Sequence, residues 1–150
     1  MIEENIKTTG ELEIVLRDEH GNIKEQRTVP NLVVSIGKTA IAARLAGTSV
    51  SVMTHMAVGT VATAPVAANT TLGGEITGSR VALAVSGGTP ASNVVTYSAT
   101  FAAGVGTGAV TEAGIFNAVS LGSMLCRTTF AVVNKDVSDA LTITWNVSIN

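Results

Sequence analysis

The clearest pattern along the chain is an alternation of apolar and polar residues over residues 94–116, interrupted by a glycine-rich turn. The apolar side chains at a period of two are Val95, Tyr97, Ala99 and Phe101. This alternation is typical of a strand with one face in a core. The turn Gly104-Val-Gly-Thr-Gly108 suits a chain reversal, because glycine adopts positive φ at low steric cost. We therefore predict two neighbouring strands, in the simplest arrangement a hairpin, at the centre of an all-β domain.

Both ends of the chain carry further strand patterns. Residues 11–18 alternate, and residues 23–29 follow after a turn, which predicts a charged hairpin suited to an exposed edge. Pro30 is expected to end that pairing, since proline lacks the backbone N–H. Residues 141–149 alternate most regularly, with Trp145 among the apolar positions. We predict that this last strand lies inside a sheet with Trp145 in the core.

The remaining elements are shorter. Strands are predicted over residues 54–59, 80–86 and 124–130, and loops over 60–71 and 117–123. One short helix is predicted over residues 37–46, where alanine and leucine are frequent and Gly47 can cap the C-terminus. Seven to nine short strands with one helix predict a β-sandwich or a jelly-roll-like fold, formed by a single domain over residues 10–150.

The segment of residues 1–9 is polar and acidic and shows no alternation. It cannot bury much apolar area, so we predict a flexible N-terminal arm. Ile2 and Ile6, four residues apart, are candidate anchors on a neighbouring subunit. The alternative is a tail without a role.

Charge is scarce and unevenly distributed. Charged residues make up 13% of the 150 residues, about half of the usual quarter, and between Leu45 and Val110 only Glu75 and Arg80 carry formal charge. A monomer normally spreads charge over its surface to stay soluble, so this stretch is expected to be buried against other subunits. The alternative is a neutral surface exposed to water. The candidate interface residues in this stretch are Thr60, Thr63, Pro65, Thr70 and Thr71.

Several partners and locations are disfavoured by composition. The net charge of −2 disfavours nucleic acid as a partner. The chain has no run of 18 or more apolar residues, so no transmembrane helix is expected. The acidic N-terminal sequence does not resemble a signal peptide. Cys126 is the single cysteine, which fits folding in a reducing cytosol.

Motifs for cofactors, metals and covalent chemistry are weak. Gly37-Lys38-Thr39 suggests a phosphate-binding loop, but that loop needs a glycine where this chain has Leu32. His20 and His55 have no partners at metal-ligand spacing, and Cys126 is interpreted as a small buried side chain. We predict no cofactor, no metal and no catalytic residue.

Glu112 is the one conspicuous charge in a neutral region. We interpret it as a structural ion pair, with Arg80 and Arg127 as candidate partners within the chain or across an interface. A catalytic carboxylate is the alternative. It usually has a second carboxylate or a base nearby, whereas Asp136 and Asp139 are a whole strand away.

Several segments together resemble a known family. They read Asn-Leu-Val-Val (31–34), Thr-His-Met-Ala-Val-Gly-Thr (54–60), Thr-Glu-Ala-Gly-Ile-Phe-Asn (111–117), Met-Leu-Cys-Arg-Thr-Thr-Phe (124–130) and Leu-Thr-Ile-Thr-Trp (141–145), together with 95–101. In this order they resemble small virion structural proteins of tailed bacteriophages, described as capsid decoration, cement or tail-fibre-like proteins. The resemblance covers nearly the whole chain and implies a place in the virion and no catalytic residues.

Three functions follow as hypotheses. The first is a capsid decoration (cement) protein that binds major capsid subunits as a symmetric homo-oligomer, a trimer being one option. The second is a tail, collar or fibre-attachment protein. The third is a receptor- or carbohydrate-binding module, for which the chain offers few aromatic side chains. An enzyme is not expected, because no set of titratable residues converges in the sequence.

Overall fold

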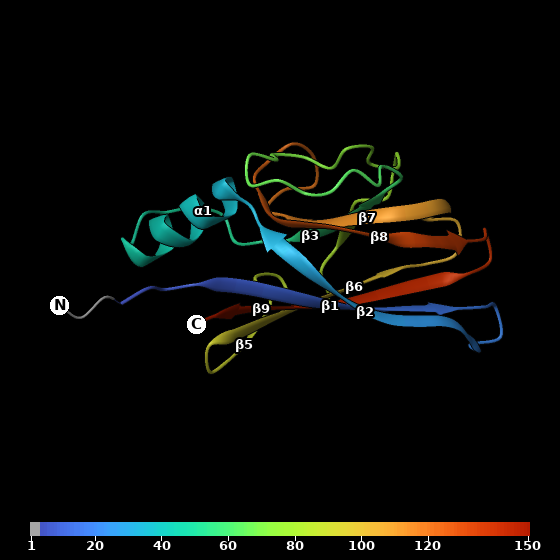
Figure 1. Cartoon of the computed structure of the whole chain (residues 1–150). Helices are drawn as coiled ribbons and strands as arrows, with labels where there is room; N and C mark the ends of the chain where they lie inside the picture. Colours follow the sequence, from blue (N-terminus) through green and yellow to red (C-terminus); the bar gives the residue numbers. More distant parts are fainter. Residues whose placement is uncertain (1–3) are drawn as a thin grey trace.

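The computed structural model describes residues 4–150 and shows an all-β, sandwich-like fold, as the alternating patterns predict. Among these residues there are nine strands and one helix (Figure 1). They are β1 (Thr8–Arg17), β2 (Ile23–Val33), α1 (Ser35–Leu45), β3 (His55–Gly59), β4 (Val81–Ala82), β5 (Thr89–Ala91), β6 (Val94–Phe101), β7 (Gly108–Phe116), β8 (Met124–Lys135) and β9 (Ala140–Ile149). The strand order is β4-β3-β7-β8-β2-β1-β9-β6-β5, and every pairing is antiparallel.

The sheet folds over itself into two layers, and β2 belongs to both. Along most of its length β2 pairs with β1, and its last residues Leu32 and Val33 pair with β8. Figure 1 shows β2 crossing from the layer of β1, β9, β6 and β5 to the layer of β8, β7 and β3. The two layers are therefore continuous along this side.

The prediction that Pro30 ends the pairing is wrong. β2 continues through Pro30, which lies opposite Glu11 of β1. Lys7 exchanges both backbone hydrogen bonds with Asn150, so odd-numbered residues of β1 bond towards β9 and even-numbered ones towards β2. Because Pro30 faces an odd-numbered residue, its missing N–H costs no bond to β1. Its carbonyl accepts a hydrogen bond from Thr128 Oγ1 on β8 at 2.6 Å.

The predicted hairpin over residues 94–116 is also wrong. Its two strands exist as β6 and β7, but β6 pairs with β5 and β9, whereas β7 pairs with β3 and β8. The glycine-rich turn therefore carries the chain from one layer to the other, with Gly104 and Gly106 at φ +80° and +64°. Alternation shows which face of a strand is buried and does not show which strand lies beside it.

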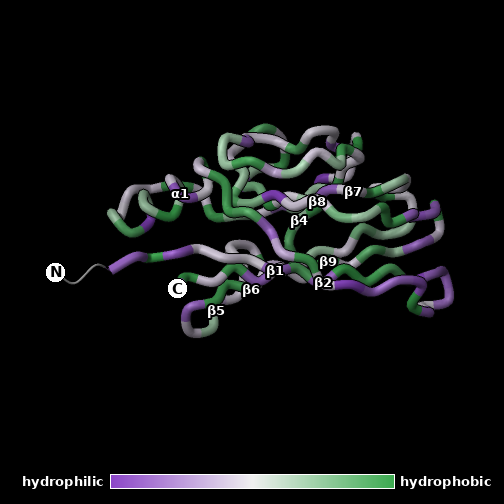
Figure 2. The backbone as a smooth tube through the Cα atoms, in the orientation of Figure 1, coloured by the Kyte–Doolittle hydropathy of each residue, from purple (hydrophilic) through white to green (hydrophobic). Residues whose placement is uncertain are grey.

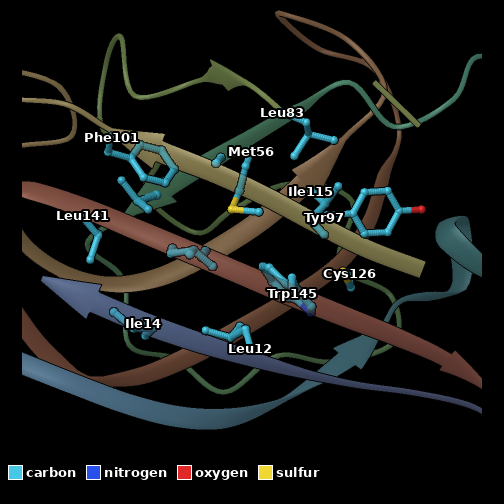
Figure 3. Close-up of a cluster of buried hydrophobic side chains, with 14 of the residues drawn as sticks. Leu12, Ile14, Met56, Leu83, Tyr97, Phe101, Ile115, Cys126, Leu141 and Trp145 are labelled. Atoms are coloured by element: carbon cyan, nitrogen blue, oxygen red, sulfur yellow. The ribbon is translucent and has the colours of Figure 1, made fainter. Parts of the chain in front are cut away.

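The core lies between the layers. The inward residues of β9 (Leu141, Ile143, Trp145 and Val147) are buried, Trp145 fully, as predicted, whereas Ile149 is 40% exposed. Figure 3 shows Trp145 packed above β1, with Tyr97, Ile115 and Cys126 across the same interior. Figure 2 shows hydrophilic residues gathered on the β1–β2 hairpin, whereas the loops over β7 and β8 are mostly neutral or hydrophobic.

Three predicted boundaries need correction. Helix α1 starts at Ser35, two residues before its predicted start, and projects beyond the sandwich (Figure 1). The predicted strand over 80–86 shrinks to β4, and Val85 is half exposed. The predicted arm of residues 1–9 overlaps β1, which begins at Thr8. Its anchor Ile2 lies outside the described residues.

Candidate protein-binding surface

The carboxylate of Glu112 anchors a long loop on the outer face of β7. Glu112 is fully buried, and its oxygens accept backbone N–H bonds from Gly74 at 2.7 Å, Gly73 at 2.9 Å and Val61 at 3.3 Å. These three donors come from residues 60–74, which we call the 60–74 loop. A stretch without regular structure therefore makes three hydrogen bonds to one buried side chain, in addition to backbone hydrogen bonds such as that of Thr60 N–H to the Gly74 carbonyl.

Arg127 completes this anchor from the neighbouring strand β8. Its Nε and Nη2 lie 2.9 and 2.8 Å from Glu112 Oε2, and its own side chain is 3% exposed. Its Nη1 donates to Asn69 Oδ1 at 3.1 Å, and the same oxygen accepts the N–H of Val66. Both ends of the loop and its middle are thus tied to one buried ion pair.

Arg80, the other predicted partner of Glu112, does not contact it. The Arg80 guanidinium binds Glu75 with two hydrogen bonds, of 3.0 and 2.7 Å, and stacks 3.8 Å above the Phe116 ring. It also donates to the carbonyls of Ala118 at 3.2 Å and Leu121 at 2.8 Å. Arg80 therefore fastens the loop of residues 117–123 to the segment that follows the 60–74 loop.

The two loops form one surface over β7 and β8, which we call the loop surface (residues 60–75 and 117–123; Figure 1). Its formal charges, Glu75 and the adjoining Arg80, bind each other, so neither is left to repel an apolar partner. The predicted interface residues Thr60, Thr63, Thr70 and Thr71 are exposed on it, and Pro65 is half-buried. An open hollow of about 490 Å³ lies among them, with Arg127 on its wall.

Exposed apolar side chains on this surface were not predicted. Val66, Val119 and Leu121 are 54%, 66% and 87% exposed. Leu121 also has φ +54°, a left-handed conformation that is costly for a leucine and is found at functional sites. The signal in the sequence is two large apolar residues, Val119 and Leu121, within the loop Asn-Ala-Val-Ser-Leu-Gly-Ser, although a loop sequence does not reveal its exposure.

The other candidate residues are not part of the loop surface. His55 contacts Thr54 Oγ1 at 2.8 Å, and Lys24 on the far side bonds Asp136 and Asp139. Cys126 is buried, and burial raises the pKa of its thiol well above the usual value. Within residues 4–150 no group of three or more His, Cys, Asp or Glu is placed to hold a metal ion. In the same range no helix is long and apolar enough to cross a bilayer.

Fold and surface together define an antiparallel, sandwich-like β-domain with a neutral surface built from two clamped loops. Comparison with known proteins found no match: no family model, no curated protein and no solved structure is similar to this chain.

Proposed function

We propose that the protein is a structural subunit that binds other protein subunits through the loop surface, as a decoration protein on the head of a tailed phage. The observation that carries the proposal is the neutral loop surface, on which Val66, Val119 and Leu121 remain exposed while the charges are paired internally. The place in a virion rests on the resemblance of the sequence segments.

The physical reasoning starts from desolvation. The centre of a protein interface is depleted of charge, because only a well-formed ion pair offsets the free energy that a charge loses on desolvation. Here the two arginines already have their partners within the chain, so binding need not strip water from free ions. The loops are also held by hydrogen bonds within the chain, which lowers the entropy lost on association.

The features of the same surface also bear on the two alternative functions. A tail, collar or fibre-attachment protein needs an equally neutral interface, so only its copy number in the particle separates it from a decoration protein. A carbohydrate-binding module usually presents aromatic side chains to its ligand. In the described part of this chain the five aromatic residues (Trp145, Tyr97, Phe101, Phe116 and Phe130) are buried, which favours a protein partner.

The test is binding to phage particles that lack this protein. The variant Thr63→Lys/Thr70→Lys/Leu121→Lys places three charges on the loop surface, and its matched control, Thr96→Lys/Ser98→Lys/Thr100→Lys, places three on the outer face of β6. Co-sedimentation should show at least about tenfold weaker binding for the first variant and unchanged binding for the control. Equal urea midpoints for both would show that folding is intact.

Two results would contradict the proposal. If the wild-type protein does not bind the particles, the proposed role in the virion is wrong. If the two variants bind equally well, the loop surface is not the binding site. Mass spectrometry of intact particles then separates head from tail. Decoration requires a copy number comparable to that of the major capsid protein.

A further inference from the structure

A small apolar pocket lies between α1 and the strands β6 and β8. It has a volume of about 150 Å³, and its apolar walls are Ala40, Ile41, Val52, Met53 and Leu125. An apolar cavity of this volume holds a group of roughly six carbon atoms. Sites for drug-sized ligands are larger, at about 300–1,000 Å³. The pocket therefore has the size of a single apolar side chain.

Tyr97 places a hydroxyl in this apolar surrounding. The residue lines the pocket and is only 8% exposed, and Figure 3 shows its hydroxyl directed away from Ile115 and Trp145, out of the core. Within residues 4–150 this hydroxyl has no hydrogen-bond partner, although a buried tyrosine hydroxyl usually finds one. Burial raises the pKa of Tyr97 to about 12, so the hydroxyl keeps its proton at neutral pH. It is therefore a free donor for an oxygen atom of a ligand.

Arg44 supplies a positive charge beside the same pocket. It lies in the last turn of α1, and its side chain is exposed. Of the described residues that line the pocket, only Arg44 is charged, and no ion pair within residues 4–150 includes it. A guanidinium binds a carboxylate through two parallel hydrogen bonds. The pocket thus fits a carboxylate that is attached to a short apolar group.

The segment of residues 50–52 offers unpaired backbone groups at this place. All three residues line the pocket, and their N–H and C=O groups make no hydrogen bond within residues 4–150. Pairing resumes at Met53, whose C=O accepts the N–H of Gly87 at 2.7 Å. A polypeptide can bond to such groups through its own backbone, whereas a small free acid has only its carboxylate to offer. The unpaired backbone therefore favours a polypeptide as the occupant.

We propose that this pocket, which we call the α1 pocket, binds the C-terminal residue of a partner protein that ends in leucine or an apolar residue of similar size. The apolar side chain enters the pocket, and the terminal carboxylate lies between the Arg44 guanidinium and the Tyr97 hydroxyl. The residue before it pairs with the backbone of residues 50–52. The α1 pocket shares no residue with the loop surface, so it is a second protein-binding site.

Titration of the full-length, ¹⁵N-labelled protein with short peptides tests the site. The peptide acetyl-Ser-Gly-Ser-Leu with a free carboxylate should shift the amide signals of residues 50–53 in NMR spectra. The same peptide with a C-terminal amide loses the contact with the guanidinium, and the peptide that ends in glycine loses the burial of the side chain. Each should bind at least about tenfold more weakly.

Variants separate the carboxylate contact from other effects. Arg44→Gln should weaken binding of the acid peptide at least about tenfold and leave binding of the amide peptide unchanged, because only the acid meets the guanidinium. Tyr97→Phe removes one hydrogen bond and should weaken binding of the acid about fivefold. The control Lys38→Gln removes the same charge from the same helix outside the α1 pocket. At about 0.15 M salt it should bind as wild type does.

Three results would overturn the proposal: no shift at residues 50–53 with about 5 mM acid peptide, equal binding of the acid and the amide, or equal weakening by Arg44→Gln and Lys38→Gln. A fourth concerns 4-methylpentanoate, which has the same carboxylate and branched chain without a peptide backbone. If it binds as tightly as the peptide, the occupant is a free acid and not the end of a protein. None of these results bears on binding through the loop surface.

Discussion

Replacement of Glu112 by glutamine is the sharpest test of the clamp that builds the loop surface. Glutamine has nearly the same size, so the change removes the negative charge without opening a cavity. It leaves Arg127, which is 3% exposed, without its ionic partner. Its amide NH₂ also faces backbone N–H donors, because Glu112 uses both oxygens to accept from residues 61, 73 and 74. The variant therefore combines an unpaired buried charge with unsatisfied donors.

The magnitude follows from the burial of the pair. Removal of one partner of a buried ion pair costs about 3–5 kcal/mol. The lost charge-assisted hydrogen bonds are part of this figure and are not added to it. A domain of this kind is stable by about 5–15 kcal/mol, so the variant should fold with a much lower urea midpoint. Glu75→Gln removes the partner of Arg80 at a more exposed pair and should cost about 0–1 kcal/mol.

The contribution of the ion pair is tested by measuring the free energy of unfolding in urea for four proteins. They are wild type, Glu112→Gln, Glu75→Gln and the double variant Glu112→Gln/Arg127→Met. The double variant should be more stable than Glu112→Gln alone, since it no longer buries an unpaired cation. A loss below about 1 kcal/mol for Glu112→Gln, or a double variant no more stable than Glu112→Gln alone, would show that the ion pair does not hold the 60–74 loop.

Three further outcomes are expected. Trp145→Ala should lose about 3–5 kcal/mol in urea unfolding, because Trp145 is fully buried; a loss below about 1 kcal/mol contradicts its place in the core. The hydrogen bond from Lys24 lowers the pKa of Asp139 in the folded protein. The ionised carboxylate therefore stabilises the fold above the unfolded pKa of about 3.9. This stabilisation is lost as the pH falls through the lower pKa of the folded state. Urea unfolding from pH 7 down to pH 2 should therefore show a steeper loss for wild type than for Asp139→Asn, and parallel curves would refute this. Leu121→Gly should leave the stability unchanged or raise it by up to about 1 kcal/mol, because glycine tolerates φ +54°. Particle binding in the sedimentation assay should weaken. Unchanged binding would show that Leu121 is not part of the interface.

The sequence by itself determined the all-β class, the inward face of β9 and the position of the single described helix to within two residues. Period-two alternation records which side of a strand meets the core, and this is a local property of the chain. The buried role of Trp145 followed from this pattern alone. The scarcity of charge between Leu45 and Val110 predicted a surface buried against other subunits, and this stays a prediction.

Tertiary structure decided how the strands are paired and which charges meet. The separation of β6 from β7, the passage of β2 through Pro30 and the choice of Arg127 over Arg80 all depend on contacts between residues distant in sequence. Arg80 and Arg127 are equivalent candidates in the sequence because a side chain's partner is set by the register of neighbouring strands. In β7 and β8, Gly114 lies opposite Arg127, which brings Arg127 to Glu112 two residues away, and Arg80 lies over Phe116 instead. Alternation fixes the face that each strand buries, and only the folded sheet fixes its neighbour.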